Sequence, residues 1–288
     1  MKIKFKKTNK FIVFLVLFLL IIICVSVPWI KNSVKNPIAV KPTNRTPIIF
    51  VPGSSAGENR FDDLFSLINK EDKHSILKVE VDTNNKLNIK GHVRPTDHEP
   101  FFVIAFKNNK DGYINIKKQA YWLNTAINYL SQRYSFNNFS FFGHSNGGLI
   151  ITLYLEKYFD QSKMIVNRLM MLGSPFNLDQ SNPDKKTIML QYMIANKKRL
   201  PKNLIVYLIA GAKNYNNDDL VPVSSVYSGK YVYQNQVKKF TEATITGSDA
   251  EHSDLPQNKQ VVQLMKLYLQ INHRFIKNSV TKNINEQR

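Results

Sequence analysis

Phe139-Ser140-Phe141-Phe142-Gly143-His144-Ser145-Asn146-Gly147-Gly148-Leu149-Ile150 places a serine between two glycines, where a short apolar run ends and a helical pattern begins. This pattern is typical of a nucleophile elbow, a sharp strand-to-helix turn that exposes a serine. The turn strains the backbone at the serine, and small residues two positions before and after it let strand and helix pass closely. Gly143 and Gly147 meet that need. The first N–H groups of the helix would favour negative charge beside the serine oxygen, so the stretch predicts acyl-transfer chemistry at Ser145.

Apolar runs and helical patterns alternate on both sides of this stretch, from residue 47 to residue 275. Such alternation is typical of an α/β fold in which helices cover both faces of a mostly parallel sheet. A chain of 288 residues has room for one such domain with a full core. We expect strands at 48–51, 76–81, 87–92, 101–106, 139–142, 168–172, 204–210 and 240–246, the second and third forming a hairpin. We expect helices at 61–69, 119–134, 146–159 and 259–271, and a polar, then helical, segment at 177–199 that is long enough to cover a cleft.

An uncharged apolar segment, Phe11 to Val27, follows five lysines near the start of the chain. As a helix rising about 1.5 Å per residue, it is just long enough for the core of a thin bilayer. The lysines should stay in the cytoplasm and the rest of the chain should be exported. We interpret residues 1–30 as a basic flank with a single-pass transmembrane signal anchor, 31–46 as a linker, 47–275 as the domain and 276–288 as a polar tail. Cleavage of a signal peptide, with secretion of the domain, is the alternative.

The composition limits the partners and the chemistry of the exported part. The chain has 40 Lys and Arg against 21 Asp and Glu, a formal net charge of +19. Such an excess indicates an anionic neighbour, and outside the cell an anionic lipid or envelope polymer fits better than nucleic acid. Cys24 is the only cysteine and lies in the apolar segment, so the domain has no internal disulfide.

A serine nucleophile needs a base and a group that orients the base. An acid followed by a histidine, each on a loop after a strand, would complete the order Ser, Asp or Glu, His. Asp218 follows the strand expected at 204–210, and His252 follows the strand expected at 240–246. We expect Asp218 and His252 to complete a catalytic triad with Ser145.

Two of these assignments have competitors. His252 is one of six histidines, but three precede the serine, His144 adjoins it in a turn where neighbouring side chains diverge, and His273 ends a helix. Asp219 stands next to Asp218, and the choice between the two aspartates stays open.

An oxyanion hole needs two preorganised N–H donors about 3 Å from the developing charge. One should be the backbone N–H of Asn146, directly after the serine. The other should come from the loop after the first strand, Pro52-Gly53-Ser54-Ser55, where we expect the backbone N–H of Ser54 to serve.

Five blocks of sequence together indicate a protein family more specifically than the elbow alone does. They are Glu99 to Asn109, Gly143 to Gly148, Gly173 to Asn177, Asp218 to Pro222 and Glu251 to Leu255. With them the chain resembles the α/β-hydrolase superfamily over about 47–275. More narrowly, it is similar to the uncharacterised membrane-anchored cell-surface hydrolases of low-GC Gram-positive bacteria. The resemblance implies a Ser-His-Asp site. The chain departs from the pattern at Pro52, at Asn146, where an apolar residue is usual, and at Asp219, where glycine is common.

The sequence thus predicts an extracytoplasmic, membrane-anchored serine hydrolase that acts on an ester or related acyl bond of a small molecule or lipid. No cofactor is expected, and no metal, because no His, Cys and Asp cluster has ligand spacing. An acyltransferase with the same triad is one alternative. A non-catalytic envelope-binding module on a hydrolase fold is another, and an intact triad argues against it.

Overall fold

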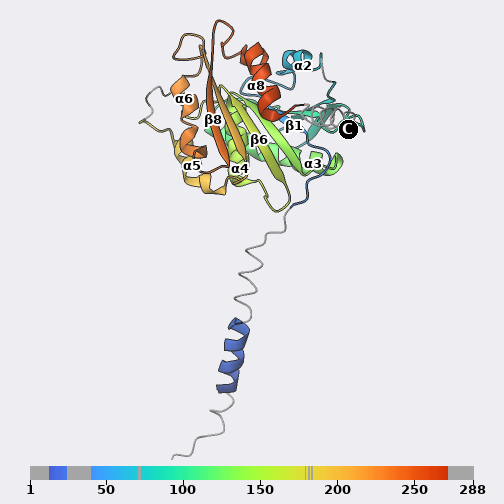
Figure 1. The fold of residues 1–288 in the computed structure, drawn as a ribbon, viewed down its shortest axis with the longest axis vertical. Helices are drawn as coiled ribbons and strands as arrows, with labels where there is room; N and C mark the ends of the chain where they lie inside the picture. The colour runs from blue at the N-terminus through green and yellow to red at the C-terminus, as the bar shows by residue number, and fades with distance from the viewer. Residues whose placement is uncertain are drawn as a thin grey trace, which may run out of the picture. The chain divides into compact units, whose positions relative to one another are not determined.

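The computed structural model describes residues 13–24, 40–70, 73–178, 180, 182 and 184–271. The chain divides into two units, Met1–Lys41 and Pro42–Arg288. In the first unit, residues 13–24 form a helix, drawn in blue in Figure 1. No helix within the described residues is both long and apolar enough to cross a membrane. Both ends of the predicted anchor at 11–27, most of the predicted linker and the tail at 276–288 lie outside the described residues.

The second unit is built on one eight-stranded sheet with the order β3-β2-β4-β1-β5-β6-β7-β8. The strands are β1 (Ile48–Val51), β2 (Ile76–Val81), β3 (Leu87–Gly91), β4 (Phe101–Phe106), β5 (Asn138–His144), β6 (Ile165–Leu172), β7 (Ile205–Ala212) and β8 (Lys239–Thr246). The β2–β3 hairpin is antiparallel and the other neighbouring pairs are parallel. The predicted mostly parallel sheet and its hairpin are therefore confirmed. β5, which leads to the serine, lies near the middle of the sheet.

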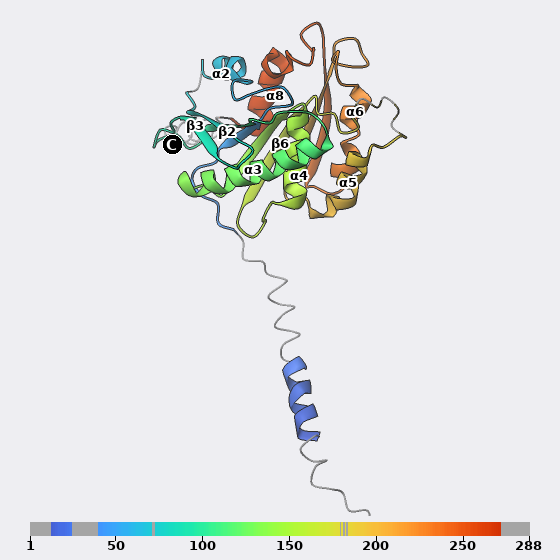
Figure 2. The same ribbon diagram turned by 180° about the vertical axis from the view of Figure 1, so that it is seen from behind.

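Helices cover both faces of this sheet, as predicted. They are α2 (Asp62–Ile68), α3 (Tyr113–Arg133), α4 (Asn146–Lys157), α5 (Ile188–Asn196), α6 (Val223–Tyr227), α7 (Lys230–Tyr233) and α8 (Lys259–Leu269), with short 3₁₀ turns η1 (Lys197–Arg199) and η2 (Leu255–Gln257). Figures 1 and 2 show α3 and α4 on one face and α2 and α8 on the other. The buried side chains form two separate clusters, one beneath each helical layer. Burial of apolar surface on both faces explains why the central strands are almost continuously apolar.

The predicted boundaries differ most from the structure at α3. This helix starts at Tyr113, six residues before the predicted start at Gln119. Of residues 113–118 only Ile116 is buried, so the apolar periodicity that reveals a helix is weak there. Gly112, with φ 97°, ends the preceding loop in a conformation that favours glycine and so fixes where the helix begins. The short helices α6 and α7 lie where no element was predicted.

Candidate active site

Ser145 occupies the turn between a central strand and a helix. β5 ends at His144, α4 begins at Asn146, and Ser145 between them has φ 55° and ψ −132°. A positive φ is uncommon for a residue with a side chain and stores strain. Two backbone hydrogen bonds hold the turn, from Ser145 N–H to the Leu172 carbonyl (2.8 Å) and from Gly148 N–H to the Ser145 carbonyl (3.1 Å). The predicted elbow is thus present.

The glycines of the elbow permit close contacts between chain segments. A Cβ atom on Gly147 would lie 2.0 Å from the Val51 carbonyl oxygen, and one on Gly143 would lie 2.8 Å from Gly148 N. A Cβ atom on Gly53 would lie 2.5 Å from the Cβ atom of Ser145. The loop after β1 therefore passes directly against the serine, where it can present an N–H group.

Asp218 and His252 form a buried pair. Their side chains meet at 2.7 Å, between His252 Nδ1 and Asp218 Oδ2. The other carboxylate oxygen, Oδ1, accepts from the backbone N–H groups of Leu220 (3.1 Å) and Val221 (2.7 Å). The His252 N–H also donates to the Asp218 carbonyl at 2.8 Å. These bonds fix the carboxylate and, through it, the imidazole.

Asp219 points away from this pair. It has φ 71°, and its carboxylate binds Lys213 Nζ at 2.5 Å on the surface. The same ammonium group binds Glu251 Oε2 at 3.1 Å, so Lys213 joins the loop of the acid to the loop of the histidine. Of the two candidate aspartates, the structure therefore brings Asp218, and not Asp219, to His252.

His144 packs against His252 and binds its backbone. The two rings are 4.7 Å apart, and His144 Nε2 lies 3.0 Å from the His252 carbonyl oxygen. Because a carbonyl only accepts, this contact requires the proton on Nε2. Burial, and then the charges of His252 and Arg60, hold the pKa of His144 well below its ordinary value of 6.5. His144 is thus a neutral donor at this position.

Ser145 and His252 share the wall of a cavity of about 660 Å³. Its apolar lining residues include Pro175, Leu178, Leu220 and Val221. Its polar lining residues include Ser54, Ser55, Arg60, Asp111, Asn146 and Ser253. Within the described residues no hydrogen bond joins the Ser145 hydroxyl to the imidazole, although hydrogen bonds in catalytic sites are often loose before substrate binds.

The loop with Ser54 and the start of α4 meet at this cavity. Neither the Ser54 N–H nor the Asn146 N–H has an acceptor among the described residues. The side-chain nitrogen of Asn146 donates to Ser54 Oγ and to Asp111 Oδ1, both at 2.7 Å. The residue after the serine thereby ties together the two segments that carry the predicted oxyanion donors.

Arg60 and Asp111 line the cavity but were not predicted. Arg60 donates to the Ser253 carbonyl at 2.6 Å. Burial lowers the pKa of Arg60, and the charges of Asp254 and Asp63 raise it by a smaller amount. Asp111 stands at the end of the loop after β4, two residues before α3. Neither belongs to a motif, so only the fold reveals that they face Ser145.

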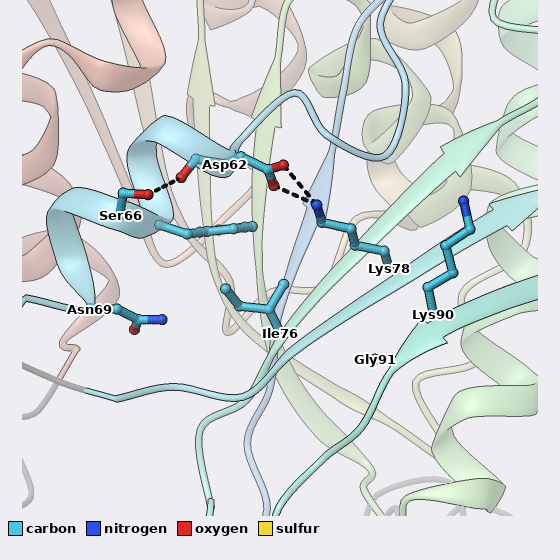
Figure 3. Close-up of a pocket in the computed structure, with 8 residues that line it drawn as sticks. Asp62, Ser66, Asn69, Ile76, Lys78, Lys90 and Gly91 are labelled. Carbon is cyan, nitrogen blue, oxygen red and sulfur yellow. Dashed lines mark hydrogen bonds and ion pairs between the residues drawn. The ribbon is translucent and has the colours of Figure 1, made fainter.

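A second cavity, of about 530 Å³, lies between α2 and the β2–β3 hairpin. Figure 3 shows Lys78 in this cavity bound to both oxygens of Asp62. The ammonium group lies 2.7 Å from Oδ1 and 2.8 Å from Oδ2. Lys90, the other lysine of the lining, is paired with Glu58. Both cations are therefore neutralised by carboxylates of the protein itself.

Comparisons with known proteins give the same fold. An α/β-hydrolase family of unknown function, DUF915, matches residues 35–272. A protein from Lactobacillus plantarum, described as a candidate cell surface hydrolase, is 50% identical, with 79% of this chain and 92% of that chain covered and a TM-score of 0.73. A gene product from Listeria innocua is 26% identical, with 78% and 94% covered and a TM-score of 0.72. No curated protein is similar enough to count as a match. The chain therefore belongs to the DUF915 family of α/β hydrolases.

Proposed function

We propose that this protein is an extracytoplasmic serine hydrolase that cleaves an ester or related acyl bond. The observation that carries the proposal is the buried His252–Asp218 pair, 2.7 Å long, which opens onto the same cavity as the strained Ser145. A base oriented by a fixed carboxylate, beside a serine exposed on a sharp turn, is the arrangement that activates a hydroxyl for attack on a carbonyl.

In this proposal each group has one role. His252 takes the proton of Ser145 as the hydroxyl attacks, and returns it to the leaving alcohol. Asp218 keeps the imidazole in the tautomer with the proton on Nδ1 and stabilises the imidazolium that forms. The N–H groups of Ser54 and Asn146 bind the oxyanion, and loss of one such donor costs about 2.7–4 kcal/mol of barrier. Water then attacks the acyl-enzyme. His252 takes a proton from this water and passes it to the oxygen of Ser145, which releases the acid.

The mixed lining of the cavity supports a substrate with an apolar and a polar portion. Leu178, Leu220 and Val221 suit an apolar acyl group, because burial of apolar surface is favourable. Arg60 and Asp111 suit a polar alcohol portion.

Membrane attachment through the apolar segment at 11–27 is part of the proposal. Its support is the uncharged apolar run behind five lysines and the surface location in the description of the Lactobacillus relative. Extraction of membranes from the producing cell with alkaline carbonate is the test. An anchored protein stays in the pellet, whereas a cleaved one appears in the medium and lacks residues before the cut.

The full chain treated with a fluorescent fluorophosphonate tests the catalytic proposal. The parent and Ser253→Ala should be labelled, because Ser253 also lines the cavity but has no role in the reaction. Ser145→Ala should not be labelled, and His252→Ala should be labelled far more slowly. A folded parent that reacts no faster than Ser145→Ala would contradict the proposal and favour a binding module.

A further inference from the structure

A third cavity, of about 590 Å³, contains positive charge without a partner. It lies where α5, η1, α7 and the loop after α7 meet, and it shares no residue with the cavity of Ser145. Its lining includes Lys186, Lys197, Lys230, Tyr231, Gln234 and Asn235. It has three lysines and no acidic residue.

The three ammonium groups converge on Tyr231. Lys186 Nζ lies 4.7 Å and Lys230 Nζ 5.4 Å from the centre of the tyrosine ring. Lys197 Nζ donates to the Tyr231 carbonyl at 3.1 Å. The attraction of a cation to an aromatic face, and this hydrogen bond, hold like charges together that would otherwise repel.

No carboxylate neutralises these lysines within the described part of the chain. None of the three forms an ion pair there. Glu242 on β8 is close enough for Lys230 to act on its charge, but burial opposes its ionisation and raises its pKa. The cavity of Figure 3 is the contrast, because Lys78 and Lys90 there each have a carboxylate partner.

Further cations continue from the cavity along the surface. Lys198 and Arg199 follow Lys197 in η1, and both are exposed. Lys202 donates to the Gln236 carbonyl at 3.2 Å, directly beside the Gln234 and Asn235 part of the lining. The positive charge therefore extends beyond the space that one small anion would fill.

We propose that this cavity, the lysine cavity, binds a phosphate group of an anionic polymer with repeated phosphodiesters. A phosphate has several acceptor oxygens for the free donors of three ammonium groups, and the flanking cations would meet its neighbours along the polymer. The three ammonium groups line a cavity and not a flat face, which suits a chain that can enter it more than headgroups held in a bilayer surface. The site shares no residue with the cavity of Ser145 and would hold the enzyme on the polymer.

The test uses the full chain in a non-ionic detergent and long-chain inorganic polyphosphate with a fluorescent end label. Fluorescence anisotropy gives the Kd of the parent, of the triple variant Lys186→Gln/Lys197→Gln/Lys230→Gln, and of the control Lys86→Gln/Lys118→Gln/Lys259→Gln. The control removes the same charge at exposed positions outside the cavity. The cavity variant should bind at least about tenfold more weakly than the parent, while the control should change the Kd by about threefold or less.

Thermal unfolding of both variants shows whether the fold is kept. Two competition experiments against the labelled polyphosphate then distinguish a polymer from a single phosphate ion and from a lipid surface. Inorganic phosphate, at equal phosphate concentration, should displace the polymer poorly. Equal weakening in both triple variants would overturn the proposal, because binding would then follow net charge alone. Efficient displacement by inorganic phosphate would show a site for a single anion. Displacement by micelles containing phosphatidylglycerol, and not by neutral micelles, would show a lipid surface as the partner.

Discussion

The side chain of Asn146 donates a hydrogen bond to Ser54 Oγ at 2.7 Å, so the residue after the proposed nucleophile is tied to the loop with the other proposed oxyanion donor. Both donors are backbone N–H groups, and their positions depend on how the two segments are held together. The bond from Asn146 to Asp111 adds a third segment to the same cluster.

Asn146→Ala should therefore lower kcat for a p-nitrophenyl ester by about tenfold, with KM little changed, because the oxyanion site is less well organised. Asn128→Ala, an exposed asparagine of α3, is the matched control and should leave kcat unchanged. The thermal midpoint should move little in either variant. If kcat of Asn146→Ala equals that of the parent, the side chain does not position the donors.

The two neighbouring aspartates should differ sharply in their effect on catalysis. Asp218→Asn replaces the carboxylate that fixes the imidazole, and a change of this kind lowers kcat by on the order of 10⁴. Asp219→Asn breaks only a surface pair with Lys213, so kcat should stay within about twofold. Steady-state hydrolysis by the two variants checks this, and equal losses would show that the buried pair has no special role.

His144 should make the fold sensitive to acid. Its folded-state pKa lies below the ordinary value of 6.5, so below pH 6.5 the unfolded chain takes up a proton that the folded state does not bind. The contribution of His144 to the free energy of unfolding should therefore fall as the pH drops below 6.5. His144→Gln keeps a donor toward the His252 carbonyl but cannot titrate, so it should gain stability relative to the parent between pH 7 and pH 5. Thermal unfolding at the two pH values measures the difference, and parallel changes in parent and variant would contradict the assignment.

Glu156, in the last turn of α4, should have the opposite effect. Its side chain is buried, neither oxygen has a hydrogen-bond partner within the described residues, and burial raises its pKa from 4.5 to about 9, against the charge of Arg199. Between these values the folded state retains a proton that the unfolded chain has released, so stability falls as the pH rises.

Glu156→Gln removes this dependence and should raise the free energy of unfolding at pH 8 by roughly 1–3 kcal/mol. At pH 4 the parent and the variant should have nearly equal stability. Urea unfolding at both pH values is the measurement. A variant that is less stable than the parent at pH 8 would show that the carboxylate is ionised and paired in the folded state.

The parts of the fold that follow from local pattern could be predicted from the sequence. All six residues of β4 are buried, and this burial is why the strand is a continuous apolar run in the sequence. The order of serine, acid and histidine could be predicted as well, because each follows a strand of a parallel sheet and such strand ends share one edge.

What could not be predicted depends on contacts between distant segments. The choice of Asp218 over Asp219 is made by a turn in which Asp219 has φ 71° and faces Lys213. Arg60 and Asp111 reach the cavity from two separate loops, and no spacing along the chain relates them to Ser145. The convergence of three lysines on Tyr231 likewise needs α5, η1 and α7 to be packed together.

Helix α4 is flanked by two buried groups that shift in opposite senses, with His144 just before it and Glu156 near its end. Consider the pH range between the ordinary glutamate pKa of 4.5 and the ordinary histidine pKa of 6.5, where His144 stays neutral in the folded state. In this range unfolding releases a proton from Glu156 and adds a proton to His144. The two exchanges then cancel, and the fold around the helix that follows Ser145 has a built-in compensation against mild acidification. Replacement of either residue alone should reveal the pH dependence that the other gives to the free energy of unfolding. Replacement of both should again leave this free energy independent of pH in that range.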